Sequence, residues 1–177
     1  MDFKKLKNLL KEKRFSYIGK LYKENPRATV YLVGGAVRDI LLNYSITQLL
    51  NYIPSDDLDF VVEGIKRDEL ENFLEQNGTV KDVESRAFGV FIFVPKGQKE
   101  SFDVALPRDE HWIGGGYKDI EVNWEGRTLK DDLSRRDFTI NAMAVDISKI
   151  KKREGIDNVL IDPYSGREDI LKKIIKV

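Results

Sequence analysis

The chain has 177 residues, of which 41% are hydrophobic and 34% charged, and its 30 basic and 30 acidic side chains give a formal net charge of zero. This balance predicts a compact domain with a real core and gives no bulk electrostatic signal for nucleic-acid binding. The absence of cysteine excludes disulfides and thiolate metal sites, and a single histidine excludes a multi-histidine zinc site. No apolar run reaches the roughly 18 residues of a membrane span, so we expect a cytoplasmic protein with no membrane contact.

The first elements expected along the chain are helices followed by a strand. Residues 3–22 carry apolar side chains at helical spacing and predict one or two amphipathic helices, which end at Asn25-Pro26. The β-forming run 29–33 predicts a buried strand. Gly34-Gly35 breaks this strand, and residues 36–42 read as a helix that begins at once.

The middle of the chain predicts alternating elements. Residues 43–56 are expected to form a loop with one short helical turn. Gly78 is expected to end the helix that precedes it in sequence. The expected elements are a strand at 58–62, a helix at 68–76, and a hairpin of strands 88–94 and 101–106.

The last part of the chain begins with a charged stretch, 107–128, which contains Gly114-Gly115-Gly116 and predicts a mobile loop with a short strand at 120–122. The elements expected after it are a helix at 134–143, strands at 144–147 and 160–161, and a helix near 167–175. Strands with intervening helices predict an α/β (α+β) fold, in which helices flank a mixed β-sheet.

Asp57 and Asp59 lie two residues apart at the start of a predicted strand. Residues i and i+2 of a strand point to the same face, so the two carboxylates would repel each other unless a cation joined them. Mg²⁺ favours one or two carboxylates together with waters and substrate phosphates. The alternative is an ordinary acidic strand end. Asp103 becomes a third carboxylate if its strand lies beside that of Asp59; otherwise it faces solvent.

The turn Gly34-Gly35 and Arg38 form a second candidate site. Glycines allow close backbone approach, a helix N-terminus offers N–H groups to phosphate, and Arg38 adds a positive charge. The pattern is neither a P-loop nor a dinucleotide fingerprint. The alternative is a tight strand-to-helix turn without a ligand.

The segment Arg135-Arg136-Asp137 is the third candidate. Within the predicted helix, an arginine could reach a triphosphate or ribose while the neighbouring aspartate holds it. The alternative is a surface ion-pair cluster. His111 has no partner at a catalytic spacing, and we assign it no role.

Taken together and in order, these segments resemble the class II tRNA nucleotidyltransferases (CCA-adding enzymes) and bacterial poly(A) polymerases of the polymerase-β superfamily. The resemblance covers roughly residues 28–175. The matching segments are LVGGAVRDILL at 32–42, SDDLDFVV at 55–62, FDVALPR at 102–108, DDLSRRDFTINAMA at 131–144 and DPYSGREDI at 162–170.

The resemblance implies a polymerase-β-like nucleotidyltransferase head that transfers a nucleotide from ATP or CTP to an RNA 3′ end, with tRNA as the expected RNA. Asp57 and Asp59 would hold catalytic Mg²⁺, and Asp103 would complete the metal shell. The groups implied to contact the nucleotide are Gly34, Gly35, Arg38, Arg135, Arg136 and Asp137, of which the last three would help to select ribose. Asp162 and Gly166 would act near the junction with a following domain.

The chain departs from the family at residues 43–55, which are longer than the usual link, and at Val177, where we expect the head to end before a neck domain. We expect an N-terminal helical extension at 1–27 and the catalytic head at 28–177. Without a neck, body and tail, RNA binding would be weak, and another chain or a C-terminal part could complete the enzyme. The alternatives are a nucleotide-binding or assembly fragment with little turnover, and a DNA-repair or small-molecule nucleotidyltransferase. The Arg-Arg-Asp-Phe-Thr block argues against a DNA-repair or small-molecule nucleotidyltransferase.

Overall fold

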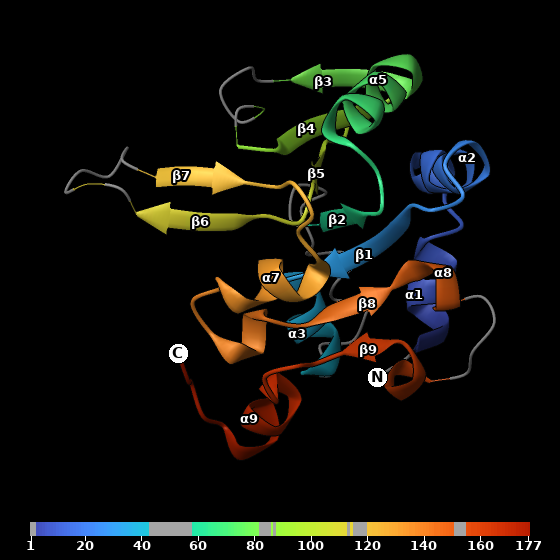
Figure 1. Ribbon diagram of the computed structural model, residues 1–177. Coiled ribbons are helices and arrows are strands. Elements are labelled where there is room, and N and C mark those ends of the chain that lie inside the picture. The colour runs from blue at the N-terminus through green and yellow to red at the C-terminus, as the bar shows by residue number, and fades with distance from the viewer. Residues whose placement is uncertain are drawn as a thin grey trace.

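The computed structural model describes residues 3–42, 58–81, 86, 88–112, 114, 120–150 and 155–177. A seven-stranded mixed sheet in the order β3-β4-β5-β2-β1-β8-β9 runs through this part of the chain (Figure 1). Only the central pair β2–β5 is parallel; the other neighbours in this sheet are antiparallel. Its strands are β1 (Thr29–Val33), β2 (Asp59–Glu63), β3 (Gly78–Lys81), β4 (Val90–Pro95), β5 (Phe102–Ala105), β8 (Ala144–Asp146) and β9 (Leu160–Ile161).

A separate two-stranded ribbon pairs β6 (Asp109–Trp112) with β7 (Ile120–Asn123) and projects from the side of the molecule (Figure 1). The α-helices are α1 (Phe3–Leu9), α2 (Ser16–Glu24), α3 (Gly35–Leu41), α5 (Arg67–Asn77), α7 (Leu129–Ser134), α8 (Ile147–Ile150) and α9 (Gly166–Lys172). Short 3-10 turns are η1 (Lys13–Phe15), η3 (Thr139–Asn141) and η4 (Ile156–Asn158). No helix among the described residues is long and apolar enough to cross a membrane.

The two faces of the sheet carry cores of different size. The alternation of side chains along each strand sends Leu32, Phe60 and Val104 into the larger core, which helices α1, α2, α3, α5 and α8 also line. Val33 and Val61 point the other way, into a smaller core completed by Leu129 and Leu133 of α7. The helix that contributes buried side chains to this smaller core is the short α7.

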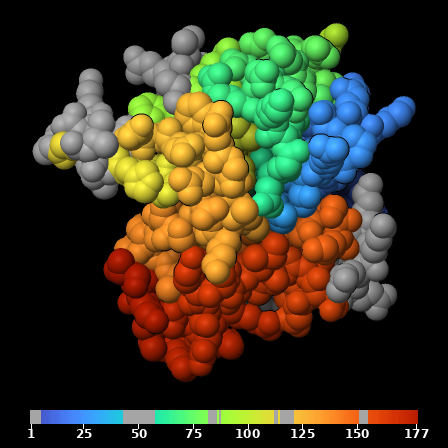
Figure 2. Space-filling model, viewed as in Figure 1, coloured from blue at the N-terminus to red at the C-terminus, as the bar shows by residue number. Residues whose placement is uncertain are grey.

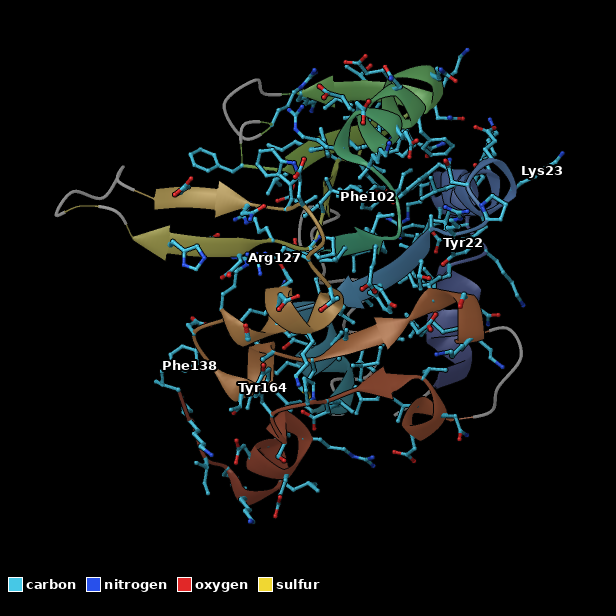
Figure 3. All side chains as sticks on the ribbon, in the orientation of Figure 1. Tyr22, Lys23, Phe102, Arg127, Phe138 and Tyr164 are labelled. Carbon is cyan, nitrogen blue, oxygen red and sulfur yellow. The ribbon has the colours of Figure 1, made fainter. Side chains whose placement is uncertain are left out.

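The N-terminal helices pack into the larger core. Phe15 is 2% exposed, and its ring centroid lies 5.1 Å from that of Phe102 and 6.0 Å from that of Phe60. Figure 3 shows Phe102 in the middle of the molecule. Residues before β1 thus pack against β2 and β5 within the larger core. The division into an extension at 1–27 and a head at 28–177 stays a prediction.

The mixed sheet with flanking helices is confirmed, as are the strands expected near 29–33, 58–62, 88–94, 101–106, 144–147 and 160–161. The expected helix at 134–143 is wrong: α7 ends at Ser134, and Phe138 is extended with φ −130° and ψ 141°. The Asp137 carboxylate accepts the Phe138 N–H, a local bond that competes with helix formation. In the stretch 107–128, expected as a loop with one strand, the strand at 120–122 is confirmed as β7, and β6 pairs with it where only loop was expected. The predictions for 43–56, for Asp57, and for Gly115 and Gly116 lie outside the described residues.

Candidate active site

Asp59 and Asp103 lie side by side at the centre of the sheet. They are direct partners in the parallel register of β2 and β5. Both alternate with residues of the larger core, namely Phe60 next to Asp59 and Phe102 and Val104 around Asp103. Both carboxylates therefore point to the α7 face of the sheet, where each is partly exposed. The expectation that Asp103 lies on the strand beside Asp59 is confirmed.

This carboxylate pair has the chemistry of a site for a hard divalent cation. Oxygen donors from one or two carboxylates, with waters and phosphate oxygens in the remaining positions, suit Mg²⁺. Asp57, the other predicted ligand, precedes the described part of β2 by two residues and lies outside the described residues. Within those residues, no group of three or more histidine or acidic side chains could hold a metal. The assignment of Mg²⁺ to Asp57, Asp59 and Asp103 stays a prediction.

Gly34 opens a space directly beside Asp59. Its φ of +71° lies in the region that favours glycine, and a Cβ added there would stand 3.5 Å from Oδ2 of Asp59. The same Cβ would stand 3.0 Å from Nη1 of Arg136. The backbone at Gly34 thus has a carboxylate and a guanidinium beside it. A side chain at position 34 would crowd both groups.

Arg135 and Arg136 follow α7 and share one buried carboxylate, that of Asp132, which is 0% exposed. Arg135 donates from Nε (3.1 Å) and Nη2 (2.6 Å) to Oδ1 of Asp132. Arg136 donates from Nη2 to Oδ2 at 3.0 Å. The side chain that holds these arginines is therefore Asp132 and not the predicted neighbour Asp137. In Figure 2 the orange segment that contains α7 lies in the middle of the visible face, between the green and red regions.

The ribbon β6–β7 joins this arginine cluster through Glu110. Oε1 of Glu110 accepts Nη1 of Arg135 at 2.8 Å and Nε of Arg108 at 2.9 Å. Burial, and then the nearby Arg135 guanidinium, lower the pKa of Arg108. Glu110 lies between the two cations and offsets their repulsion. Arg127, at the approach to α7 (Figure 3), pairs with Asp109 of the same ribbon at 3.6 Å.

Arg38 of α3 is held by two side chains. Its Nη1 donates to Oδ1 of Asn141 at 2.9 Å, and its Nε donates to Oδ1 of Asp39 at 2.9 Å. The Asn141 amide donates in turn to Oδ1 of Asp137 at 3.3 Å. Asp137 therefore positions η3, and through it Arg38, in place of pairing with Arg136. A Cβ on Gly35 would lie 3.5 Å from Nη2 of Arg38.

The structure thus gathers Gly34, Asp59, Asp103 and Arg136 around one face, with Arg38 next to Gly35. Sequence reasoning missed Glu110 and Asn141 and gave Asp132 no role. The spacings i to i+3 and i to i+4 from Asp132 to the two arginines were the available signal. His111, 60% exposed in its side chain, pairs with Asp109 on the ribbon at 3.1 Å, away from these groups.

Asp162 and Gly166 lie at the start of α9. The Asp162 carboxylate accepts the N–H groups of Gly166 at 2.7 Å and Arg167 at 3.0 Å. A Cβ on Gly166 would overlap the carbonyl of Thr139, so α9 packs closely on η3. Here both residues fix a helix against the turn that carries Asn141.

Comparisons with known proteins identify the relatives of this chain. The family model described as "Poly A polymerase head domain" matches residues 30–176. The CCA-adding enzyme of Francisella tularensis subsp. tularensis (strain FSC 198) is 39% identical over 147 residues, which are 82% of this chain and 33% of the relative. The multifunctional CCA protein of Stenotrophomonas maltophilia (strain K279a) is 37% identical over 148 residues, covering 83% and 30%.

Solved structures show the same likeness. The Bacillus stearothermophilus CCA-adding enzyme in complex with CTP aligns with a TM-score of 0.61 and 28% identity over 92% of this chain and 32% of its own. A tRNA nucleotidyltransferase complexed with a primer tRNA and an incoming ATP analog aligns at 0.57 and 30%, over 90% and 38%. The chain spans about a third of the length of the curated relatives that it matches. Because the family model covers most of the sequence and the 39% identity extends over 82% of it, the chain belongs to the poly(A) polymerase head-domain family.

Proposed function

We propose that the chain is the catalytic head of a template-independent RNA nucleotidyltransferase, which transfers a nucleotide from ATP or CTP to the 3′-hydroxyl of an RNA, with tRNA as the substrate. The observation that carries the proposal is the acidic pair Asp59–Asp103 beside the space above Gly34, with the Arg136 guanidinium at the edge of that space. Relatives of known structure were solved with CTP, with an ATP analog and with tRNA, which supports this choice of substrates.

In this reaction the RNA 3′-oxygen bonds to the α-phosphorus, the bond from that phosphorus to the bridging oxygen breaks, and pyrophosphate leaves. The fold supplies positions and charges: Gly34 lets the triphosphate approach the backbone, and Arg136 donates to it. Asp59 and Asp103, together with Asp57, would hold Mg²⁺, which supplies neutralising charge for phosphoryl transfer. Asp103 is the group proposed to accept the proton of the 3′-hydroxyl.

A second candidate is a nucleotide-binding part of a divided enzyme, without turnover of its own. The chain covers about a third of the relatives' length. The arginines, glycines and carboxylates described above address phosphate, sugar and metal, which all nucleotides share. Base selection would then depend on groups outside this chain.

The two candidates differ in primer extension. The chain, a short tRNA-like RNA, Mg²⁺ and ATP or CTP are incubated, and products are resolved by length. Turnover by the parent that is lost in Asp59→Ala and in Asp103→Ala supports the proposed enzyme. Glu125→Gln, on an exposed turn and not among the residues assigned to the site, serves as the control and should retain extension. If the Asp59→Ala variant extends RNA as well as the control does, the site assignment is wrong. If the parent chain binds nucleotide but does not extend RNA, the second candidate is supported.

A further inference from the structure

Asp132 is the charged side chain that the described structure buries most completely, at 0% exposed. A carboxylate removed from water is costly unless cations and hydrogen bonds compensate for the loss of hydration. Here both oxygens are compensated: Oδ1 by Arg135 and Oδ2 by Arg136. Removing the charge would therefore release two arginines at once.

The two arginines have different freedom. All three nitrogens of the Arg135 guanidinium have a carboxylate partner, with Nε and Nη2 on Asp132 and Nη1 on Glu110. Arg136 donates from Nη2 to Asp132, while its Nε has no hydrogen-bond partner within the structure. Its Nη1 lies at the space above Gly34. Arg135 thus anchors Asp132 to the ribbon β6–β7, and Arg136 presents its remaining edge to the candidate phosphate position.

We propose that Asp132 is a positioning residue, which orients Arg136 toward the triphosphate, and that Arg135 acts by holding Asp132 and not by contacting the nucleotide. This inference rests on the nucleotide site of the proposed function. It divides the Arg135-Arg136 pair into one arginine that contacts substrate and one that supports the contact. A guanidinium fixed in its productive geometry loses less conformational entropy when it binds phosphate than a mobile one.

The neighbouring residue Asp131 provides a matched control. Its carboxylate caps α7, accepting the N–H of Thr128 at 2.8 Å and the Thr128 hydroxyl at 2.7 Å. Asp131 contacts neither arginine in the structure. The changes Asp131→Asn and Asp132→Asn are chemically identical, adjacent in sequence and on the same helix, so both can lower stability but only one should affect Arg136.

The test measures binding of Mg-ATP to the chain by titration calorimetry, together with thermal unfolding, for the two variants, for Arg136→Ala and for the double variant Asp132→Asn/Arg136→Ala. We expect Asp132→Asn to weaken binding by about tenfold or more and Asp131→Asn to leave it within about twofold of the parent. If Asp132 acts through Arg136, the double variant should bind no more weakly than Arg136→Ala alone. Arg135→Ala should resemble Asp132→Asn.

Equal affinities of the Asp131→Asn and Asp132→Asn variants, or additive losses in the double variant, would overturn the inference. If Asp132→Asn does not fold, the softer change Arg135→Lys, which keeps the charge but loses the two-nitrogen contact with Oδ1, is measured against Arg127→Lys, and equal affinities would again overturn it. A chain that binds Mg-ATP with this dependence but does not extend RNA contradicts the proposed function and supports the inference. A parent chain that does not bind Mg-ATP contradicts both.

Discussion

Gly34→Ala tests whether the space beside Asp59 receives a phosphate. Glycine tolerates the φ of +71° found here, and forcing another residue into such a region costs on the order of 1–3 kcal/mol. The added methyl would also stand 3.0 Å from Nη1 of Arg136 and 3.5 Å from Oδ2 of Asp59. We therefore expect a loss of stability within that range and a loss of Mg-ATP affinity of at least about tenfold, or ~1.4 kcal/mol.

Gly97→Ala separates the two effects. Gly97 has a φ of +75°, and a Cβ there would meet nothing within 4 Å. Chemical denaturation should show comparable losses of unfolding free energy for the two variants, while calorimetry should show a loss of nucleotide affinity for Gly34→Ala alone. If Gly34→Ala binds Mg-ATP as tightly as Gly97→Ala does, the space above Gly34 is not the phosphate position.

Further predictions concern the core, the pH dependence and the choice of base. Phe15→Ala should lower the unfolding free energy by about 3–5 kcal/mol, measured by denaturant titration, because it removes a ring packed against Phe60 and Phe102; a loss below about 1 kcal/mol would mean that the N-terminal segment is not part of the core. Burial raises the pKa of Tyr17 above its ordinary value. Because the folded-state pKa is raised, the stability gained by burying neutral Tyr17 is complete below about pH 10 and is lost as the pH rises further. Tyr17→Phe should therefore make the unfolding free energy fall less steeply at alkaline pH. An unchanged alkaline profile would refute the link to Tyr17. ATP, CTP, GTP and UTP should bind within about tenfold of one another in four titrations, and a larger preference would place base selection in this chain.

The sequence predicted the central strands because alternation and β-forming runs specify them locally. It also indicated which residue types could carry chemistry, since Gly34 and Asp59 stand out beside their strand ends and Arg136 stands out in an arginine pair. The register that makes Asp59 and Asp103 direct neighbours could be expected only conditionally, because strand order is a long-range property of the sheet.

Two features of the site could not be predicted from local pattern alone. The Arg135-Arg136-Asp137 segment was expected inside a helix, but the Asp137 side chain bonds to the next backbone N–H, and the chain becomes extended at Phe138. The role of Glu110 depends on a tertiary contact between the ribbon β6–β7 and the end of α7. Charge patterns indicate that such ion pairs can form, whereas the partner chosen depends on packing.

The parallel pairing of β2 with β5 has a consequence for the order in which the site assembles. Two parallel neighbours cannot be joined by a tight turn, and here the chain leaves β2, forms α5, β3 and β4, and only then returns as β5. Loop-closure entropy must be overcome before Asp59 and Asp103 meet, so we expect the acidic pair to form late in folding. Detachment of β5 from β2 would separate the two carboxylates. A cation held by both carboxylates would oppose this detachment and should slow hydrogen exchange in β5 more than in β1 and β8.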